Sequence, residues 1–179
     1  MSEKVLTRPS PLGHLAAIEH DLSRFLSQAI CARSLVGLFR LASRIGDWGF
    51  SACISLLLVW AHGWHAFAVY AGATGIALVV QKALKTSCAR IRPCEHPDGP
   101  PQRAPIPDRG SFPSGHTIHA VMASWIMISV LPTYAVPVVV VAILIAASRV
   151  VLGVHYVSDV VAGAAIGLVL GQLAVLSML

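Results

Sequence analysis

Long uncharged apolar segments, separated by short polar ones, make up most of the 179-residue chain after Asp47. A helix that crosses the roughly 30 Å hydrocarbon core of a bilayer needs about 20 consecutive, mostly apolar residues. The pattern therefore predicts an all-α fold, a polytopic bundle of about five transmembrane helices. The expected spans are residues 48–62, 64–84, 115–131, 135–152 and 157–178.

The connections between these spans differ in length and polarity. Residues 62–65 and residues 131–134 are tight connections without a formal charge. Residues 94–112 form a longer segment that is rich in proline, charged and without apolar periodicity. This composition is typical of a loop, and we expect it to be a lid or rim at one end of the bundle. The first span is short, but tryptophans that suit a membrane interface flank it, namely Trp48, Trp60 and Trp64.

An amphipathic segment precedes the spans. Between residues 14 and 45, apolar residues recur at helical spacing with charged residues among them, which is typical of a helix lying on a membrane surface. Arg33, Arg40 and Arg44 oppose insertion of this segment, because each central arginine costs about 2.5–3.5 kcal/mol on insertion scales. We therefore expect two regions, an N-terminal interfacial segment (residues 1–46) and a transmembrane domain (residues 47–179).

Composition agrees with an integral membrane protein. Hydrophobic residues make up 56% of the chain and charged residues 12%, which is too apolar for an ordinary soluble domain. We expect the bilayer, and no nucleic acid, as a partner. The four cysteines imply no disulfide framework, and Cys88, Cys94 and His96 fit no zinc-ligand spacing. The sequence therefore predicts no metal ion and no other cofactor.

Glycines recur at every fourth position of the last span, at Gly163, Gly167 and Gly171. Small residues at this spacing allow two helices to approach closely within a membrane. Two accounts are open, close packing against another helix of the same chain and a homodimer through the same face.

The first polar cluster is at the end of the second span and runs from Lys85 to Arg92 and Pro93. In a continuous helix these two basic residues lie on one face, about 10 Å apart along the axis, and their side chains converge on one anion. Pro93 is expected to end the helix. A plainer account is that the two cations anchor the span to lipid headgroups.

The second cluster, Ser111 to His116, precedes and opens the third span. Ser114 is a suitable N-cap, and the free backbone N–H groups after it favour an anion at the helix start. His116 would then lie at the edge of that anion. A capped helix with an interfacial histidine is the alternative. His119 is one turn further in, where it either supports this site or faces a neighbouring helix.

The third cluster runs from Ser148 and Arg149 to Asp159. Gly153 is expected to end one helix before the next begins. His155 and Asp159 are four residues apart and therefore share a helix face. A carboxylate in this position accepts a hydrogen bond from one ring nitrogen and leaves the other free as a nucleophile. Ionisable residues within apolar helices are costly, so this pair indicates a functional site.

Together the clusters resemble the three signature motifs of the type 2 phosphatidic acid phosphatase family. These motifs are a lysine with six residues between it and Arg-Pro, then Pro-Ser-Gly-His, then Ser-Arg, five residues, His, three residues and Asp. Every fixed position is present in order. The resemblance covers residues 85–159 by motif. It departs at the N-terminus, where many family members have a sixth span.

The resemblance implies a membrane phosphatase that removes phosphate from a lipid without a metal ion. In this family pattern His155 is the nucleophile that forms a phosphohistidine, Asp159 orients it, and His116 protonates the leaving oxygen and later activates water. The residues expected to hold the phosphoryl oxygens are Lys85, Arg92, Ser114, Gly115 and Arg149.

The motifs contact only phosphate, so the lipid stays open between a glycerolipid phosphate and a polyprenyl phosphate or diphosphate. Two other function classes also remain. Vanadium-dependent haloperoxidases share the phosphate site and fold core but are soluble. A non-catalytic protein that binds anionic headgroups would leave the pairing of His155 with Asp159 unexplained.

Charge distribution predicts the side of the membrane. Five spans place the N-terminal segment, the three motifs and all Lys and Arg residues on one side. The positive-inside rule then places the active site on the cytoplasmic side of a bacterial inner membrane. A hidden crossing within residues 14–45 would place it on the outer side instead.

Overall fold

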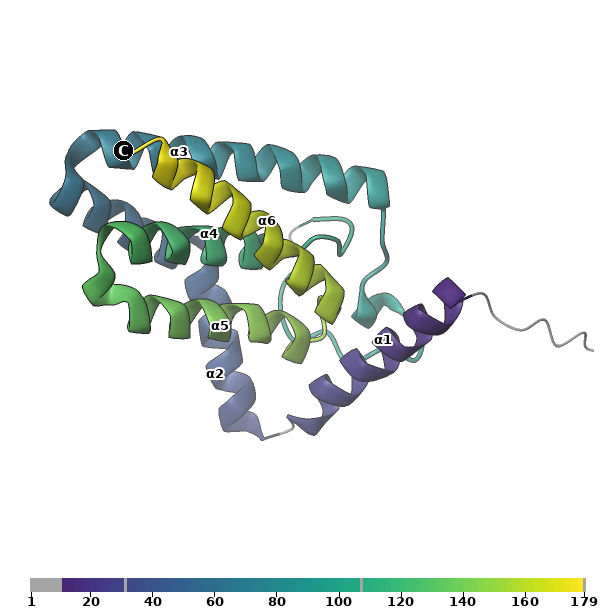
Figure 1. Ribbon diagram of the computed structural model, residues 1–179. Helices are drawn as coiled ribbons and strands as arrows, with labels where there is room; N and C mark the ends of the chain where they lie inside the picture. Colours follow the sequence, from purple (N-terminus) through teal and green to yellow (C-terminus); the bar gives the residue numbers. More distant parts are fainter. Residues whose placement is uncertain (1–10, 31, 107, 179) are drawn as a thin grey trace, which may run out of the picture.

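The computed structural model describes residues 11–30, 32–106 and 108–178, and these contain helices and loops but no strand (Figure 1). The expected all-α fold is thereby confirmed. The α-helices are α1 (Pro11–Ala29), α2 (Arg33–Arg44), α3 (Phe50–Cys88), α4 (Gly115–Val130), α5 (Ala135–Val151) and α6 (Val157–Leu176).

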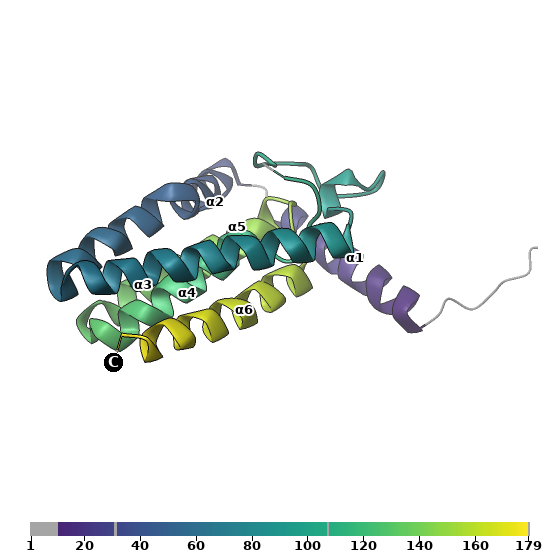
Figure 2. The same ribbon diagram turned by 90° about the horizontal axis from the view of Figure 1, so that it is seen from above.

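The long helix α3 consists of two halves that meet at Gly63. This glycine has φ 75° and ψ −171°, outside the helical region, in a conformation that side chains rarely permit. The ribbon turns back at this break (Figures 1 and 2). At the end of the first half, His62 Nε2 lies 3.0 Å from the carbonyl oxygen of Val130 at the end of α4. The expected spans 48–62 and 64–84 therefore correspond to the two halves of α3.

The first half of α3 continues directly from α2. Between them lies one π-helical turn, η1 (Ile45–Gly49), and the residues at its two ends, Arg44 and Phe50, have helical dihedral angles. The helix therefore passes without interruption through the expected boundary at residue 46. The division of the chain into two regions stays a prediction.

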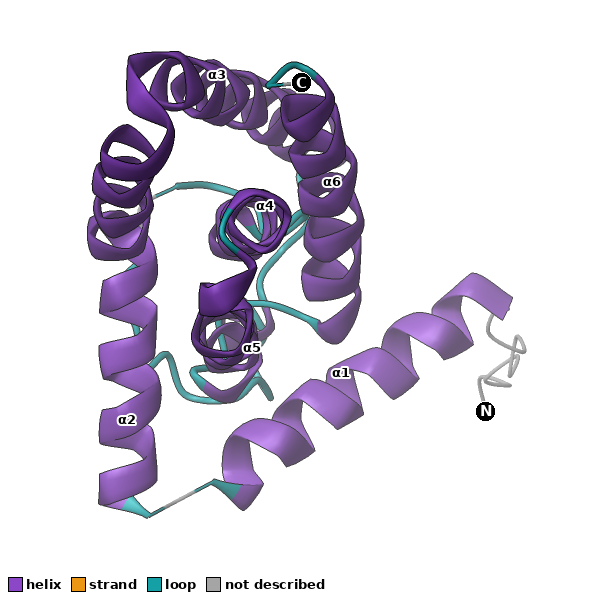
Figure 3. Ribbon diagram, turned by 60° about the vertical axis from the view of Figure 1, so that its left-hand side comes forward, coloured by secondary structure: helices purple, strands orange, loops and turns teal. Residues whose placement is uncertain are grey.

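Helix α4 lies at the centre, with α3, α5 and α6 around it (Figure 3). Its residues Ile118, Met122 and Ile126 are fully buried in a core shared with Leu58 of α3 and Ile145 of α5. Large apolar side chains remain exposed on the outside of the bundle, for example Leu56, Trp60, Val79, Val136 and Val169. Such a surface suits lipid rather than water, as expected for an integral membrane protein.

In the part of the chain that the structure describes, three helical stretches are long and apolar enough to cross a membrane, Phe50–Glu95, Pro132–Val151 and Val157–Leu176. The number rises to four if α1 and α2, which meet at 116°, count as one bent span. Among the described residues, α4 is a shorter apolar helix, and the first stretch contains the break at Gly63. The expected number of five spans therefore stays a prediction.

The glycine face of α6 packs against α4 of the same chain. A Cβ atom at Gly163 would lie 2.7 Å from the carbonyl oxygen of Ser114, and one at Gly167 would lie 2.6 Å from that of Ile118. At Gly171 it would lie 3.0 Å from Cβ of Trp125. The close helix approach that these glycines permit is therefore made within the chain.

Helices α1 and α2 lie at the end of the bundle where α3 and α5 end and α4 and α6 begin (Figure 1). The Ser27 hydroxyl of α1 donates a 3.0 Å hydrogen bond to the carbonyl oxygen of Val151. The Arg103 guanidinium, in the loop between α3 and α4, donates to the carbonyl oxygens of Ser27 and Ile30 at 2.8 and 3.0 Å. The two N-terminal helices and this loop thus cover one end of the bundle.

Candidate active site

The three polar clusters meet at the covered end of the bundle, around a cavity of about 310 Å³. The expected site residues that line it are Lys85, Arg92, Gly115, His116, Arg149 and His155. Asp159 and Ser114 do not line the cavity and are fully buried behind it. Residues that are more than 60 positions apart in sequence thus surround one space large enough for a phosphate group.

His155 is placed by the turn between α5 and α6. Gly153 in this turn has φ 76°, which ends α5 as the sequence predicts. The His155 ring then directs Nδ1 toward Asp159 Oδ2 at 3.4 Å, and the backbone N–H of Tyr156 donates to the same oxygen at 2.9 Å. With the Nδ1 proton held toward the carboxylate, Nε2 carries the lone pair, and Arg92 Nη1 lies 3.2 Å from it.

Burial, with a smaller contribution from the positive charges of Arg149 and Arg92, lowers the pKa of His155 to about 4. The hydrogen bond with Asp159 acts in the opposite direction but is outweighed. The ring is therefore neutral at pH 7. A neutral imidazole is the form that can attack an electrophile.

Two further charged side chains, Arg90 and Glu19, lie behind Asp159. Its Oδ1 accepts a 2.8 Å bond from Arg90, whose other terminal nitrogen lies 2.5 Å from Glu19 Oε2 on α1. The second oxygen of Glu19 accepts from the backbone N–H of Ser158 at 2.9 Å. The guanidinium also lies over the Tyr156 ring, 4.1 Å from its centroid. Sequence analysis did not identify Arg90 or Glu19, because neither has a distinctive spacing to Asp159.

The prediction of a continuous helix from Lys85 to Arg92 is wrong. Helix α3 ends at Cys88, because Ala89 adopts a left-handed conformation (φ 42°) and the chain runs extended into Pro93. The expected convergence of the two cations on one anion nevertheless occurs. That anion is the carboxylate of Asp108, which lies 2.6 and 2.8 Å from Lys85 Nζ and 2.8 Å from Arg92 Nη2.

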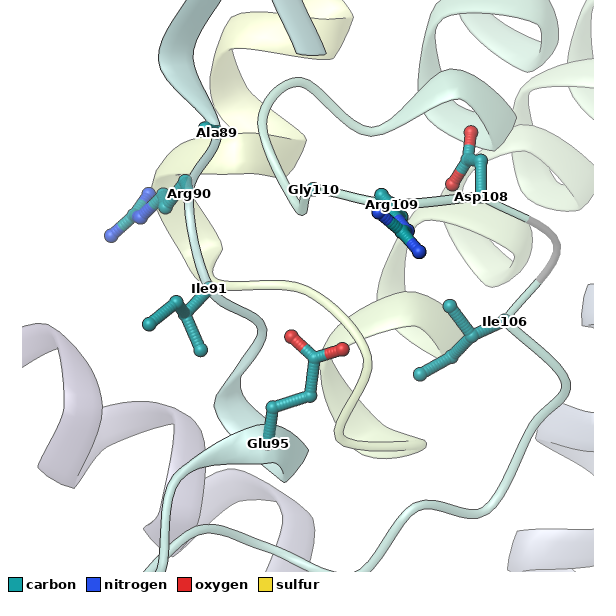
Figure 4. Close-up of a pocket in the computed structure, with 8 residues that line it drawn as sticks. All are labelled: Ala89, Arg90, Ile91, Glu95, Ile106, Asp108, Arg109 and Gly110. Atoms are coloured by element: carbon teal, nitrogen blue, oxygen red, sulfur yellow. The ribbon is translucent and has the colours of Figure 1, made fainter. Parts of the chain in front are cut away.

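Asp108 belongs to the loop before α4, and sequence analysis did not identify it. On the outer side of this loop lies a second pocket of about 500 Å³, between the segment Ala89–Ile91 and the segment Ile106–Gly110 (Figure 4). The Asp108 carboxylate points away from Glu95 of that pocket, whose own carboxylate accepts from the backbone N–H of Arg92 at 2.9 Å. Arg92 Nη1 lies 3.2 Å from His155 Nε2, so Asp108 and His155 share one cation.

We expect Asp108→Asn to strengthen inhibition by orthovanadate about tenfold, because the substitution removes an anion that competes for Lys85 and Arg92. Inhibition constants measured on the purified protein check this. Asp98→Asn, an exposed change in the same loop, serves as the matched control and should leave the constant as it is. Weaker inhibition of Asp108→Asn than of the unmodified protein would show that Asp108 helps to bind the anion.

His116 has a carboxylate partner of its own. Its Nε2 lies 2.6 Å from Oδ1 of Asp47, which is in the π-helical turn η1 between α2 and α3. Single π-helical turns are frequent at functional sites. One signal for Asp47 was present in the sequence, since it is the sole acidic residue between Asp21 and Glu95 and adjoins an apolar segment.

Helix α2, which precedes the turn η1, contacts Arg149. The Arg149 guanidinium donates to the hydroxyl of Ser43 on α2, and both side chains are buried. Contacts from α1, α2 and η1 thus reach all three polar clusters, through Glu19, Ser43 and Asp47.

Ser114 occupies the N-cap position of α4, as expected, but its side chain makes no capping bond. Its hydroxyl accepts from Thr117 at 2.9 Å, and its backbone N–H donates to the carbonyl oxygen of Asp159 at 3.0 Å. Ser114 therefore joins the start of α4 to the start of α6. The role of its side chain in holding phosphate stays a prediction.

The sequence profile of the PAP2 superfamily matches residues 66–179. The chain belongs to this superfamily. Comparison with curated proteins gives no match. The sequence expectation of a type 2 phosphatidic acid phosphatase is thus confirmed at the level of the family.

Two solved structures share the fold. The first is the crystal structure of the first transmembrane PAP2-type phosphatidylglycerolphosphate phosphatase from Bacillus subtilis, with a TM-score of 0.73 and 23% identity over 90% of this chain and 84% of that chain. The second is LpxE from Aquifex aeolicus, with a TM-score of 0.72 and 23% identity over 86% of this chain and 92% of that chain. Both likenesses cover a larger share of this chain than the residues 66–179 that the superfamily profile matches.

Proposed function

We propose that this PAP2 protein hydrolyses a lipid phosphate in the 310 Å³ cavity through a phosphohistidine on His155. The main support is the buried contact of His155 with Asp159 through Nδ1, which leaves the lone pair on Nε2, beside Arg92 and the other cations that line the cavity. A site that only bound anionic headgroups would have no use for a neutral, oriented imidazole among those cations.

In the first step His155 Nε2 attacks phosphorus, and the bond between phosphorus and the lipid oxygen breaks. The leaving oxygen keeps the electron pair of that bond and takes a proton from His116. In the second step His116 removes a proton from water, the resulting oxygen attacks phosphorus, and the bond to Nε2 breaks with its electron pair returning to the ring. Inorganic phosphate then leaves, and both histidines regain their starting protonation states.

Lys85, Arg92 and Arg149 supply the positive charge that phosphoryl transfer requires. Phosphoryl transfer depends mainly on positioning and on stabilisation of the equatorial oxygens. Three fixed cations and the backbone N–H groups at the start of α4 are sufficient for this role, so the proposed mechanism uses no metal ion. Among the described residues, no three His, Cys, Asp or Glu side chains are grouped as metal ligands would be.

The proposed substrates are glycerolipid phosphates and polyprenyl phosphates or diphosphates. One of the similar structures named above is a phosphatidylglycerolphosphate phosphatase, which supports a glycerolipid. A haloperoxidase is the second candidate, but the exposed apolar surface of the bundle favours a membrane substrate.

Phosphate release from a panel of these lipids, by protein purified in detergent and with or without EDTA, tests the proposal. We expect turnover of at least one lipid phosphate and no loss of rate with EDTA. A rate that EDTA abolishes and Mg²⁺ restores would contradict the metal-independent mechanism. Bromide oxidation with vanadate and peroxide, without lipid phosphate hydrolysis, would favour the haloperoxidase.

We propose further that the site faces the cytoplasm of a bacterial cell, because the Lys and Arg residues lie on the side of the motifs in a five-span topology. A cysteine placed at Gln102, in a background without native cysteines, should resist an impermeant maleimide in intact cells. Labelling of Gln102→Cys without permeabilisation would place the site on the outer side. A homodimer is not part of the proposal, since α4 covers the glycine face of α6.

A further inference from the structure

The catalytic cavity extends beyond the phosphate-binding cations, along two facing helices. On α3, Leu78, Gln81 and Lys85 follow one another at helical spacing and all line the cavity. On α4, His116 and His119 do the same. The cavity therefore has successive layers, with Lys85 and His116 first, Gln81 and His119 one turn further along, and Leu78 beyond them.

The middle layer contains polar atoms without partners. Both ring nitrogens of His119 and Oε1 of Gln81 are buried and accept or donate no hydrogen bond among the residues that the structure describes. Buried polar groups are almost always paired, because an unpaired one loses its hydration without compensation. Two such side chains that line the same cavity therefore indicate a ligand that would complete their hydrogen bonds.

The position of this layer identifies the part of the substrate that reaches it. His116 is the proposed donor to the leaving oxygen, so the leaving alcohol extends from His116 toward the next turn of α4. Gln81 lies against the start of that helix, since a Cβ atom at Gly115 would meet its side chain. The first atoms of the alcohol beyond the ester oxygen therefore lie between Gln81 and His119.

The chemistry of the layer suits a hydroxyl group. A neutral imidazole offers one donor and one acceptor, and Gln81 adds the acceptor Oε1, while its Nε2 donates to Asp108 Oδ2 at 3.5 Å. A hydroxyl group donates and accepts in turn. A second phosphate would require a further cation. The cations lining the described cavity are Lys85, Arg92 and Arg149. All three belong to the layer of the first phosphate.

We propose that Gln81 and His119 form a subsite for a hydroxyl group of the leaving alcohol, close to the ester oxygen. The preferred substrate is then a lipid phosphate whose leaving group is a polyol of the glycerol or sugar type, rather than a plain prenyl alcohol or a diphosphate. This inference rests on the proposed phosphatase function, which it deepens by naming the substrate class.

Three lipids with the same tail test the subsite, hexadecyl phosphate, 1-O-hexadecylglycerol 3-phosphate and hexadecyl diphosphate. We expect kcat/KM to be about tenfold higher for the glycerol compound than for hexadecyl phosphate. The glycerol compound has a free hydroxyl group that is able to hydrogen-bond to the subsite, whereas hexadecyl phosphate has none. In His119→Phe and in Gln81→Leu the ratio should fall to about one. His65→Phe, an exposed change on α3, should keep the original ratio.

The ratio is taken within each preparation, so a smaller folded fraction does not change it. No preference in the unmodified protein, or a preference that survives in both variants, would overturn the subsite. A preference for the diphosphate that disappears in His119→Phe would assign the layer to a second phosphate and would also overturn it. Hydrolysis of none of the three compounds would instead refute the phosphatase function, and the subsite with it.

Discussion

Replacement of His155 by asparagine is expected to lower kcat by at least about a thousandfold, because asparagine keeps a polar side chain at this position but has no nucleophilic nitrogen. Anion binding should persist, since Lys85, Arg92 and Arg149 reach the cavity from α3, the loop after it and α5. Loss of turnover with retained binding separates a nucleophile from a residue that holds the substrate or the fold.

Rapid quench of the unmodified protein with a labelled lipid phosphate should trap acid-labile phosphate on the chain, and His155→Asn should trap none. Orthovanadate binding measured on the same variant reports whether the cavity is intact. His65→Asn is the matched histidine control on an exposed position. Residual activity of more than a few per cent in His155→Asn would assign the nucleophile elsewhere.

The last three helices were predicted from sequence nearly to the residue. The expected spans 115–131, 135–152 and 157–178 correspond to Gly115–Val130, Ala135–Val151 and Val157–Leu176. Their ends are set locally, by the short polar connection at residues 131–134 and by the positive φ of Gly153. Signals that act over a few residues are visible in a sequence without knowledge of the fold.

The start of the helix bundle was harder to predict. Charged residues between residues 14 and 45 indicated a segment separate from the spans, yet α2 continues through η1 into α3. The arginines do not interrupt this helix, because Arg40 and Arg44 lie beside a pocket at the covered end of the bundle. Arg40 donates there to the carbonyl oxygen of Arg103. This environment depends on the loop before α4, which has no periodicity from which to predict its position.

The same limit applies to the site. Motif spacing identified six of the residues that line the cavity, but it did not identify the carboxylates Glu19, Asp47 and Asp108. Each carboxylate comes from a different element. Asp47 contacts His116 at a separation of 69 residues, and Glu19 contacts Arg90 at a separation of 71. The superfamily profile begins at residue 66, so Glu19 and Asp47 also lie outside the matched part of the chain.

Substitution of Asp47 is expected to affect the acid that serves the leaving group. In the proposed mechanism the active form has a neutral His155 and a protonated His116, so kcat/KM should be bell-shaped in pH. Because the pKa of His155 is lowered to about 4, activity is lost on the acid side as pH falls through about 4. On the basic side it is lost as His116 gives up its proton.

Asp47→Asn should lower kcat/KM at neutral pH about tenfold to a hundredfold and move only the basic limb, by about one unit toward lower pH. Burial of the His116 ring opposes its protonation, as do the facing charges of Arg149 and Lys85, whereas Asp47 favours it. Asp47→Glu should restore part of the rate and of the limb position, and the exposed change Asp21→Asn should alter neither. A purely structural role for Asp47 would lower the rate at every pH equally, and an unchanged basic limb in Asp47→Asn would therefore rule out its action through His116.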